Sequence, residues 1–403
     1  MRILFVSDTY YPHINGVYYF VCRIGPMLQD EGHEVAVIAP SSSMSSSYKK
    51  IDNLNVYGVP SFSVIFYPTI RLPFPFRKKY HLKKIINDFK PDIIHIQDHF
   101  IICKAIVQLN RKLQIPIIAT NHFMPENLTM LVHGQKVKQY FENFLWKNFS
   151  KVFNQVKLVT TPTETGVKII RDRLNVETIA ISSGIDLEKF TPFGDTQKIK
   201  AKYNIPDKPI LLYVGRIDPE KHIEEILQAV AVASKKIDFC FVIVGKGIHK
   251  KKLEQLTNEL GINKHVIFTG FVPDKDLPYF YKISRCFIIA SIAELLSLVT
   301  LQAMASGLPI IAVKAGALVE LVKNKLNGYL YNEGDLPAMV HYIENIFTND
   351  ILYEEMSKKS LELVQQHDIN KTLQSFEKVY QDYTNNNLES NPIFSSPSVL
   401  TKK

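Results

Sequence analysis

Residues 209–226 read PILLYVGRIDPEKHIEEI, in which an apolar run leads through a Gly-Arg pair into a helical pattern. A buried strand followed by a short loop and a helix is one unit of a parallel sheet covered by helices. The same rhythm recurs along the chain in two series. The apolar runs of the first series lie at 3–7, 35–39, 92–96, 116–120, 158–162 and 178–182, and those of the second at 209–215, 239–245, 265–270, 286–291 and 309–313.

The two series predict an α/β protein made of two Rossmann-like domains that face an interdomain cleft. Gly, Pro and Asp interrupt the pattern at 182–195, so we place the domain boundary near Asp186. We expect an N-terminal domain over 1–186 and a C-terminal domain over 187–367. A closing helix is predicted over 368–383 and is expected to return to the first domain, and the polar stretch 384–403 is predicted to be disordered.

The composition excludes several classes of protein. The 403 residues are 46% hydrophobic and 22% charged, which excludes fibrous or wholly disordered chains. The four cysteines form no CxxC pair and have no His at metal-ligand spacing, so we expect neither a disulfide scaffold nor a zinc site, and a reducing cytoplasm fits best. The N-terminal apolar run is too short for a signal peptide, and no run of about eighteen apolar residues occurs, so any membrane contact is expected to be peripheral.

The positive charge is concentrated in the first part of the chain. The formal net charge is +9, and residues 1–187 hold 22 Lys and Arg against 14 Asp and Glu, whereas the remainder holds 26 against 25. A basic domain fits nucleic acid, anionic lipid or an acidic small substrate, and composition alone does not choose between them.

Ligands of parallel sheets bind where the strands end, so the loops after the apolar runs hold the candidate residues. Gly16 can bring backbone N–H groups to an anion at a helix N-terminus, although an ordinary turn is the alternative. Gly215 and Arg216 follow a strand and Lys221 enters the next helix. The two cations are suited to clamping a diphosphate, and their alternative is pairing with nearby glutamates.

Two later loops carry further candidates. Gly245 and Gly247 lie between a strand and a helix, where they allow either a close approach of a nucleotide or a tight turn. Glu294 is the acid of its loop and precedes an apolar helix. A carboxylate there can accept hydrogen bonds from sugar hydroxyls, or it can serve the helix N-terminus.

Taken together, these motifs resemble family 4 of the glycosyltransferases, which are retaining enzymes of the GT-B fold. The resemblance rests on GR(x)4K after a strand, a Glu before an apolar helix, QAMASGLPIIAV at 302–313 and KNKLNGYLY at 323–331. It covers nearly the whole chain, from MRILFVSDTYYPHINGV to the closing helix. The combination is highly specific, although each piece alone is not.

The resemblance implies roles for individual residues. Gly16, Arg216 and Lys221 would hold the diphosphate of a nucleotide-sugar donor, and Glu294 its sugar hydroxyls. The loops at Gly245 and Phe271 would hold the nucleoside, and His122 would face the sugar and the acceptor. The donor-binding set expected on this basis is Gly16, Gly215, Gly245, Phe271, Val272, Ser297, Leu298 and Gln302, beside the catalytic set His122, Arg216, Lys221 and Glu294.

The chain departs from the family pattern at two positions. Gln302 stands where the family usually has a second Glu that contacts the ribose, and the usual ESFGL reads ELLSL at 294–298. Gln can still hydrogen-bond a hydroxyl, whereas Ser297 adds a side chain where backbone normally approaches the donor. These departures leave open a catalytically dead nucleotide-sugar-binding protein.

The resemblance implies no metal and no other cofactor. The acidic stretch 274–276 follows Pro273 and precedes a helical run, so we interpret this stretch as a helix N-cap. Retention without a second carboxylate beside Glu294 fits a route in which the leaving diphosphate takes the acceptor proton, and not a paired-carboxylate double displacement.

The acceptor is predicted to be a lipid such as diacylglycerol. NHFMPEN at 121–127 resembles the acceptor-side loop of diacylglycerol glucosyltransferases, and residues 71–90 hold seven Lys or Arg against one Asp, interleaved with aromatics. We expect docking on the anionic inner face of the cell membrane. The alternative is that the aromatics, including those of the stretch 136–157, are core and the lysines solvated. The expected membrane contacts are Phe74, Phe76, Arg77, Lys78, Lys79, Lys83 and Lys84.

The predicted reaction is transfer of a hexose, glucose from UDP-glucose being favoured, to this lipid. The sequence does not decide between UDP and GDP or between glucose, galactose and mannose. A glycan or an undecaprenyl-linked acceptor is the alternative within enzymes. Nucleic acid is not expected as a partner, because no nucleic-acid-binding motif accompanies the basic residues.

Overall fold

A computed structural model describes residues 1–13, 15–64, 67–74, 78–123, 134–193 and 196–385. Two expected membrane contacts, Phe76 and Arg77, lie outside the described residues, and only the backbone of Lys78 is described. Most of the NHFMPEN loop and the tail from 386 to 403 also lie outside them.

The first half of the chain is built around a sheet of eight strands within the described residues, in the order β10-β9-β8-β7-β1-β2-β4-β3. All neighbours are parallel except β3 and β4. Apart from Arg2 at the start of β1, its central strands are buried because helices cover both faces, which explains their apolar sequences. The strands are β1 (Arg2–Val6), β2 (Glu34–Pro40), β3 (Ser47–Ile51), β4 (Leu54–Val59), β7 (Ile93–Ile96), β8 (Ile117–Thr120), β9 (Leu158–Thr161) and β10 (Thr178–Ala180).

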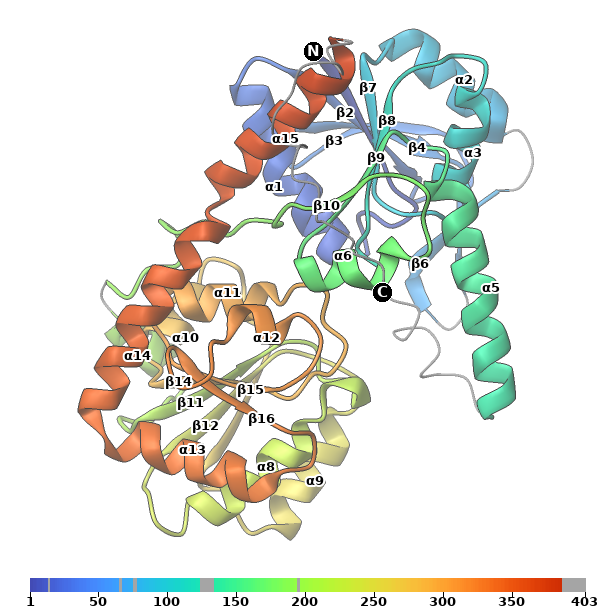
Figure 1. Cartoon of the computed structure of the whole chain (residues 1–403). Coiled ribbons are helices and arrows are strands. Elements are labelled where there is room, and N and C mark those ends of the chain that lie inside the picture. Colours follow the sequence, from blue (N-terminus) through green and yellow to red (C-terminus); the bar gives the residue numbers. More distant parts are fainter. Residues whose placement is uncertain (14, 65–66, 75–77, 124–133, 194–195, 386–403) are drawn as a thin grey trace, which may run out of the picture.

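The helices of this half are α1 (Gly16–Asp30), α2 (Lys78–Phe89), α3 (Ile101–Asn110), α5 (Gln135–Phe153) and α6 (Glu164–Arg171). A separate antiparallel hairpin joins β5 (Ser61–Val64) to β6 (Tyr67–Pro73). Helix α1 begins after Asn15, whose side chain accepts a hydrogen bond from the backbone N–H of Tyr18 at 3.0 Å. In Figure 1, α5 stands at the edge of the first half with its N-terminal end extending away from the sheet.

The second half has a six-stranded parallel sheet in the order β13-β12-β11-β14-β15-β16 over the described residues. Its strands are β11 (Ile210–Val214), β12 (Cys240–Val244), β13 (Val266–Gly270), β14 (Cys286–Ile289), β15 (Ile310–Val313) and β16 (Gly328–Tyr331). Its helices are α7 (Gln197–Lys202), η1 (Pro219–Lys221), α8 (Ile223–Ala233), α9 (Lys250–Glu259), α10 (Leu277–Lys282), α11 (Leu298–Ala305), α12 (Leu318–Leu321), α13 (Leu336–Thr348), α14 (Asp350–Leu363) and η2 (Val364–His367).

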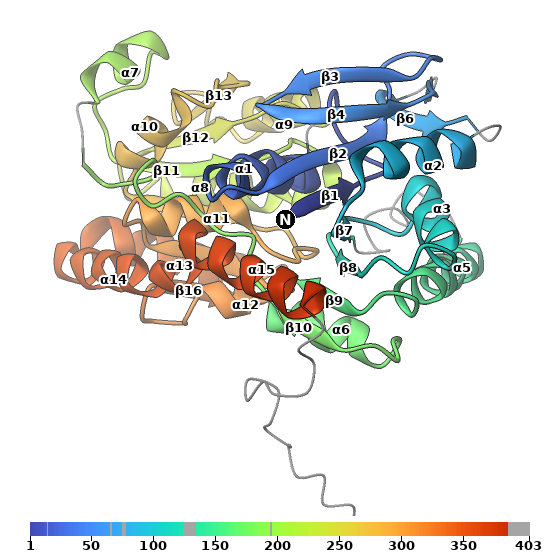
Figure 2. The same cartoon turned by 90° about the horizontal axis from the view of Figure 1, so that it is seen from above.

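The last helix, α15 (Ile369–Thr384), returns to the first half, as the sequence predicted. Its apolar face joins the first-half core, where Phe376 packs against Phe20 at 5.3 Å between ring centroids and the Tyr380 hydroxyl lies 2.8 Å from His95 Nδ1. The chain therefore crosses between the halves twice, and Ile185 and Asp368 form a backbone bridge where the two crossings meet. Figures 1 and 2 show α15 lying along the first half.

All eleven predicted strands are present, in two Rossmann-like halves. The sequence did not predict β3, β4, the β5–β6 hairpin or β16. None of the helices in the described part of the chain has the length and hydropathy needed to cross a bilayer. All four cysteines fall in that part and are free thiols.

Candidate functional site

The loops that follow β11 and β12 touch each other through glycine. A Cβ on Gly245 would lie 1.8 Å from the carbonyl oxygen of Gly215, and one on Gly247 would lie 2.0 Å from that of Ile217. Any larger residue would push the two loops apart. This contact brings the Arg216–Lys221 segment and the Gly245 loop to one edge of the second sheet, where the sequence predicted a nucleotide diphosphate.

Lys221 and Glu294 form an ion pair at this edge. Lys221 Nζ lies 2.7 Å from Glu294 Oε1 and donates a hydrogen bond to Ser291 Oγ at 3.1 Å. The two side chains are only 16% and 17% exposed. They meet because β11 and β14 are neighbours in the sheet, so the loops after these strands lie side by side. The sequence predicted both residues for the donor but not their contact.

The backbone around Glu294 is held on two sides. Ala317 N donates to Glu294 O at 2.9 Å, and Gly316 approaches so closely, at a φ of +51°, that a Cβ would lie 2.8 Å from the same oxygen. The next carbonyl, of Leu295, accepts a hydrogen bond from Thr163 Oγ1 of the first half at 2.8 Å. The carboxylate is thus mounted on a fixed loop at the boundary between the halves.

Arg216 adopts the alternative pairing that the sequence left open. Its guanidinium is bound by Asp218 and, at 2.7 Å, by Glu220, and its side chain is 67% exposed. It nevertheless lies near the first half. Burial, and secondly the charge of Arg216, lower the pKa of His13 in the loop between β1 and α1. Reaching a diphosphate would require Arg216 to exchange these carboxylates for phosphate oxygens.

Gly16 lies at the exposed N-terminus of α1, where a Cβ would meet nothing within 4 Å. Further along α1, the charge of Asp274, from the loop after β13, contributes to raising the pKa of Tyr19, for which burial is the larger cause. The start of α1 therefore faces the strand-exit loops of the second half. An anion between Gly16 and Arg216 would meet both the helix N-terminus and the guanidinium.

The two departures from the family pattern are both engaged inside the protein. Gln302 Oε1 accepts a hydrogen bond from the buried Tyr281 hydroxyl at 2.7 Å. Ser297 is 2% exposed and caps α11, since its Oγ accepts hydrogen bonds from the N–H and hydroxyl of Thr300 at 3.3 and 2.8 Å. The side chain of Ser297 is held at the start of α11 by these contacts, and the obstruction expected from it stays a prediction.

The remaining predicted donor contacts differ in exposure. Phe271 is 59% exposed at the end of β13, and Lys246 Nζ lies 5.5 Å from its ring centroid. Val272 is buried, and Leu298 is half-buried in the first turn of α11. Of these three, Phe271 offers a ring face that a nucleoside can reach.

His122 lies at the carboxyl end of β8, in the first half. Its Nε2 is 3.0 Å from Gln97 Oε1, and its ring packs against Phe20 at 5.3 Å between centroids. Burial lowers the pKa of His122 to about 4, so the imidazole is neutral at physiological pH. It can therefore offer a neutral hydrogen bond to a sugar or acceptor hydroxyl.

One buried group among the described residues has metal-ligand chemistry, namely Asp8, Asp98 and Cys103. Asp8 already accepts hydrogen bonds from the N–H groups of Ile102 and Cys103, at 2.6 and 3.1 Å, and so caps α3. Burial, and secondly the Asp98 charge, raise the pKa of Asp8. These contacts account for the group as a helix cap. The absence of a metal stays a prediction.

Asp276, within the stretch expected to cap a helix, does not cap α10 with its side chain. It stands at the N-cap position without a side-chain cap hydrogen bond and instead accepts from Lys202 Nζ at 2.6 Å and from the Tyr203 hydroxyl at 2.8 Å. Through these two contacts the carboxylate joins the end of α7 to the start of α10.

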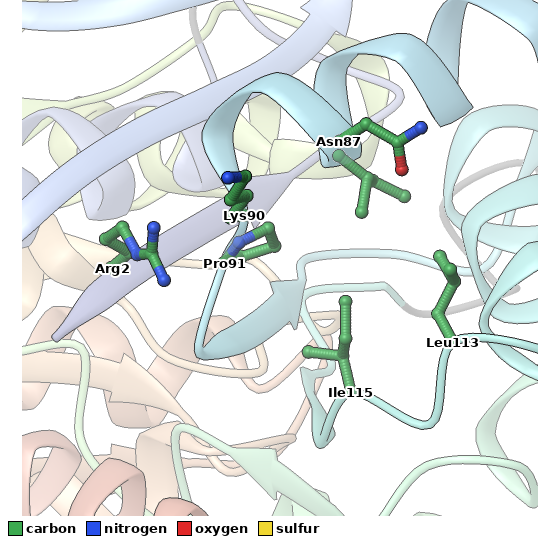
Figure 3. A pocket seen from close by; sticks show the side chains of 7 residues that line it. Arg2, Asn87, Lys90, Pro91, Leu113 and Ile115 are labelled. Atoms are coloured by element: carbon green, nitrogen blue, oxygen red, sulfur yellow. The ribbon is translucent and has the colours of Figure 1, made fainter.

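A shallow groove in the first half lies away from the strand exits (Figure 3). It is lined by Arg2, Ile86, Asn87, Lys90, Pro91, Leu113 and Ile115. Arg2 opens β1, while Pro91 and Ile115 precede β7 and β8, so the groove is at the amino ends of these strands. Arg2 is paired with Asp92 at 3.3 Å. Because the groove lies at the amino ends of the strands and not at their carboxyl ends, it is unsuitable as the donor site.

The predicted membrane residues divide into two kinds. Lys79, Lys83 and Lys84 are exposed on α2, whereas Phe74 is half-buried against Phe62, with ring centroids 5.7 Å apart. Phe74 is thus partly a packing residue.

Helix α5 carries a more exposed apolar stripe. Val137, Tyr140 and Phe144 are 59%, 76% and 58% exposed and share one helix face, while Trp146 and Phe149 are buried. The interpretation of the aromatic stretch as a membrane contact therefore fits the N-terminal part of α5, and its interpretation as core fits the C-terminal part.

The sequence predicted no role for Ser291, Gly316, Thr163 or Glu320, which the structure places around Glu294 or across the boundary between the halves. The signal for Thr163 was available, because Thr before a helical run is a common N-cap. Its contact with the other half has no local signal.

Two family models match the chain. One, described as Glycosyltransferase Family 4, matches residues 14–189, and the other, Glycosyl transferases group 1, matches 195–362. Two curated relatives are named alpha-monoglucosyldiacylglycerol synthase. The protein from Streptococcus pneumoniae is 29% identical over 90% of this chain and 82% of its own, and that from Acholeplasma laidlawii is 28% identical over 89% and 92%.

Other similar proteins differ in their named activity. A GDP-mannose-dependent alpha-mannosyltransferase of Corynebacterium glutamicum is 25% identical over 85% of this chain and 80% of its own. Among solved structures, sucrose-phosphate synthase from Thermosynechococcus elongatus has a TM-score of 0.77 at 19% identity, covering 95% of this chain and 98% of that one. Anabaena HepE in complex with UDP-glucose has a TM-score of 0.74 at 16% identity, covering 95% and 100%. These structures share the fold.

Proposed function

The chain belongs to family 4 of the glycosyltransferases and has the GT-B fold, and from this premise we propose that it transfers glucose from UDP-glucose to diacylglycerol with retention of anomeric configuration. The observation that carries the proposal is the Lys221–Glu294 pair, mounted on neighbouring strand exits in a chain that resembles two diacylglycerol glucosyltransferases along most of its length. A diphosphate needs a cation and sugar hydroxyls need an acceptor, and the pair supplies both.

In the proposed reaction, the bond between the sugar C1 and the diphosphate oxygen breaks, and a bond from the acceptor hydroxyl oxygen to C1 forms on the same face. The hydroxyl proton passes to the leaving diphosphate. Lys221 and Arg216 stabilise the charge that grows on this diphosphate. Glu294 already has Lys221 at 2.7 Å, which favours hydroxyl recognition over nucleophilic attack as its role.

A lipid acceptor must be reached at a membrane surface. The exposed stripe on α5 and the lysines on α2 belong to the half that carries His122, the residue assigned to the acceptor side. Apolar residues flanked by lysine bind anionic leaflets through shallow insertion and charge attraction together. We place the enzyme as a peripheral protein on the inner face of the membrane.

The test is transfer of radiolabel from a donor panel of UDP-glucose, UDP-galactose and GDP-mannose to vesicles with and without diacylglycerol. We expect a lipid-extractable product only from UDP-glucose and only with diacylglycerol, with an α linkage by NMR. Transfer from GDP-mannose, or to a soluble glycan, would contradict the donor or the acceptor. Binding of UDP-glucose without transfer to any acceptor would identify a catalytically dead protein.

A further inference from the structure

The first turn of α6 is held by the opposite half of the protein. Glu320 Oε2 accepts from the N–H of Glu164 at 3.1 Å, and Glu320 Oε1 accepts from the N–H of Thr165. The next N–H, of Gly166, is taken by Thr163 Oγ1 at 3.1 Å. A helix leaves its first N–H groups without backbone partners, and a carboxylate there also benefits from the helix dipole.

Thr163 uses its hydroxyl in two directions at once. The oxygen accepts from Gly166 N within α6, and the proton is donated across the boundary to Leu295 O at 2.8 Å. The side chain is 3% exposed. A hydroxyl has one donor and two acceptor positions, so one group can satisfy both partners.

Both contacts converge on the loop that carries Glu294. Leu295 is the next residue in the chain, and Ala317, which donates to Glu294 O, lies three residues before Glu320. One short segment, 316–321, therefore holds the backbone of Glu294 through Ala317 and contacts α6 through Glu320. Figure 1 shows α6 at the lower edge of the first half with α12 facing it.

We propose that Thr163 and Glu320 form an interdomain latch that positions Glu294 for the donor sugar when the two halves are together. Thr163 and Glu320 hydrogen-bond backbone groups and not the expected donor position, so both are positioning residues. The inference rests on the proposed role of Glu294 and adds that the acceptor half takes part in holding the donor sugar. Transfer would then depend on the contact between the halves more strongly than nucleotide binding does.

The variants separate the latch from the helix cap. Thr163→Asp keeps an N-cap acceptor for Gly166 but has no proton to donate to Leu295, whereas Thr163→Ser keeps both hydrogen bonds. Glu320→Ala removes the two hydrogen bonds that Glu320 accepts from the N–H groups of Glu164 and Thr165. Glu355→Gln, at an exposed position on α14, is the matched control.

Hydrogen exchange of the full chain is the first readout and needs no donor. We expect amide exchange in 292–298 to rise at least tenfold in Thr163→Asp and Glu320→Ala, and to stay within twofold of the parent in Thr163→Ser and Glu355→Gln. Unchanged exchange in both disrupting variants would overturn the latch, whatever the enzyme's substrate.

Kinetics with UDP-glucose give the second readout. We expect Thr163→Asp and Glu320→Ala to lower kcat at least tenfold while the Kd for UDP changes less than twofold, with Thr163→Ser restoring turnover. Parallel losses of UDP binding and turnover would overturn a positioning role. A parent protein that transfers from no donor would refute the proposed function, and the exchange experiment would still decide the latch.

Discussion

Breaking the Lys221–Glu294 pair tests the centre of the candidate site. The perturbations are Lys221→Met, which keeps the length of the side chain without its charge, Glu294→Gln, which keeps the shape, and the double variant. Two unit charges 4 Å apart attract by about 4 kcal/mol at an effective dielectric constant of about 20, and desolvation of the partly buried pair cancels much of this. Contacting residues couple by about 0.5–3 kcal/mol in double-mutant cycles.

Both side chains are about five-sixths buried, so we expect a coupling free energy near the upper part of that range, about 2 kcal/mol. It is measured from urea unfolding of the four proteins without ligand. Loss of the contact with the diphosphate should further cost Lys221→Met about 2–4 kcal/mol in kcat/KM, a factor of roughly 30 to 1,000. Glu294→Gln should lower sugar transfer more than it lowers UDP binding.

Three results would refute this reasoning. Additive unfolding free energies, within about 0.5 kcal/mol, would show that the contact does not couple the two residues. Unchanged kcat/KM in Lys221→Met would remove Lys221 from the diphosphate site. Equal weakening of UDP and of UDP-glucose by Glu294→Gln would show that the carboxylate does not recognise the sugar.

Three further predictions follow from other residues. Gln302→Glu keeps the acceptor for the Tyr281 hydroxyl and adds a stronger acceptor for ribose, so calorimetry should show tighter UDP-glucose binding with an unchanged product; weaker binding would show that the position is misassigned. Changing Lys79, Lys83 and Lys84 together to Ser should weaken sedimentation with anionic vesicles by roughly tenfold or more at low salt, since each basic residue contributes about 1 kcal/mol, and binding insensitive to salt and to these changes would refute docking. His99 packs among phenylalanines with both ring nitrogens unpartnered, and burial lowers its pKa to about 4. Between about pH 6.5 and 4 the unfolded chain binds a proton at this residue and the folded chain does not, so His99 lowers the unfolding free energy as pH falls through that window. His99→Phe should reduce the slope of the unfolding free energy against pH by up to about 1.4 kcal/mol per pH unit and stabilise the protein at pH 7 by about 1 kcal/mol. An unchanged slope in urea unfolding would contradict this prediction.

The parallel strands could be predicted because burial on both faces demands continuous apolar sequence, as in ILFV and IIHI. The strand β3 could not, because Lys49 and Lys50 make SYKKI an exposed edge strand with no apolar pattern. The β5–β6 hairpin is antiparallel and stands outside the βαβ rhythm, and β16 is a four-residue strand after the four-residue helix α12. The sequence therefore predicts the central strands of both sheets and misses β3 and β16 at sheet edges, together with β4 beside β3.

The candidate site was predictable in its members but not in its contacts. The rule that ligands bind at strand exits selected Lys221 and Glu294 separately. Their pairing depends on β11 and β14 being neighbours, and strand order is a property of the whole sheet. The hydrogen bond from Thr163 to Leu295 depends on how two domains meet, which no local pattern encodes.

The ion pair also bears on the order of events in the proposed reaction. Without donor, Lys221 is committed to Glu294 and Ser291, and Arg216 is committed to Asp218 and Glu220. An arriving diphosphate competes for both cations, and each carboxylate that loses its partner needs new donors because partial burial makes an unpaired charge costly. Sugar hydroxyls can satisfy Glu294 in this way, whereas free UDP brings no sugar. Donor binding would then be favoured over UDP binding by the same exchange of partners that places the sugar.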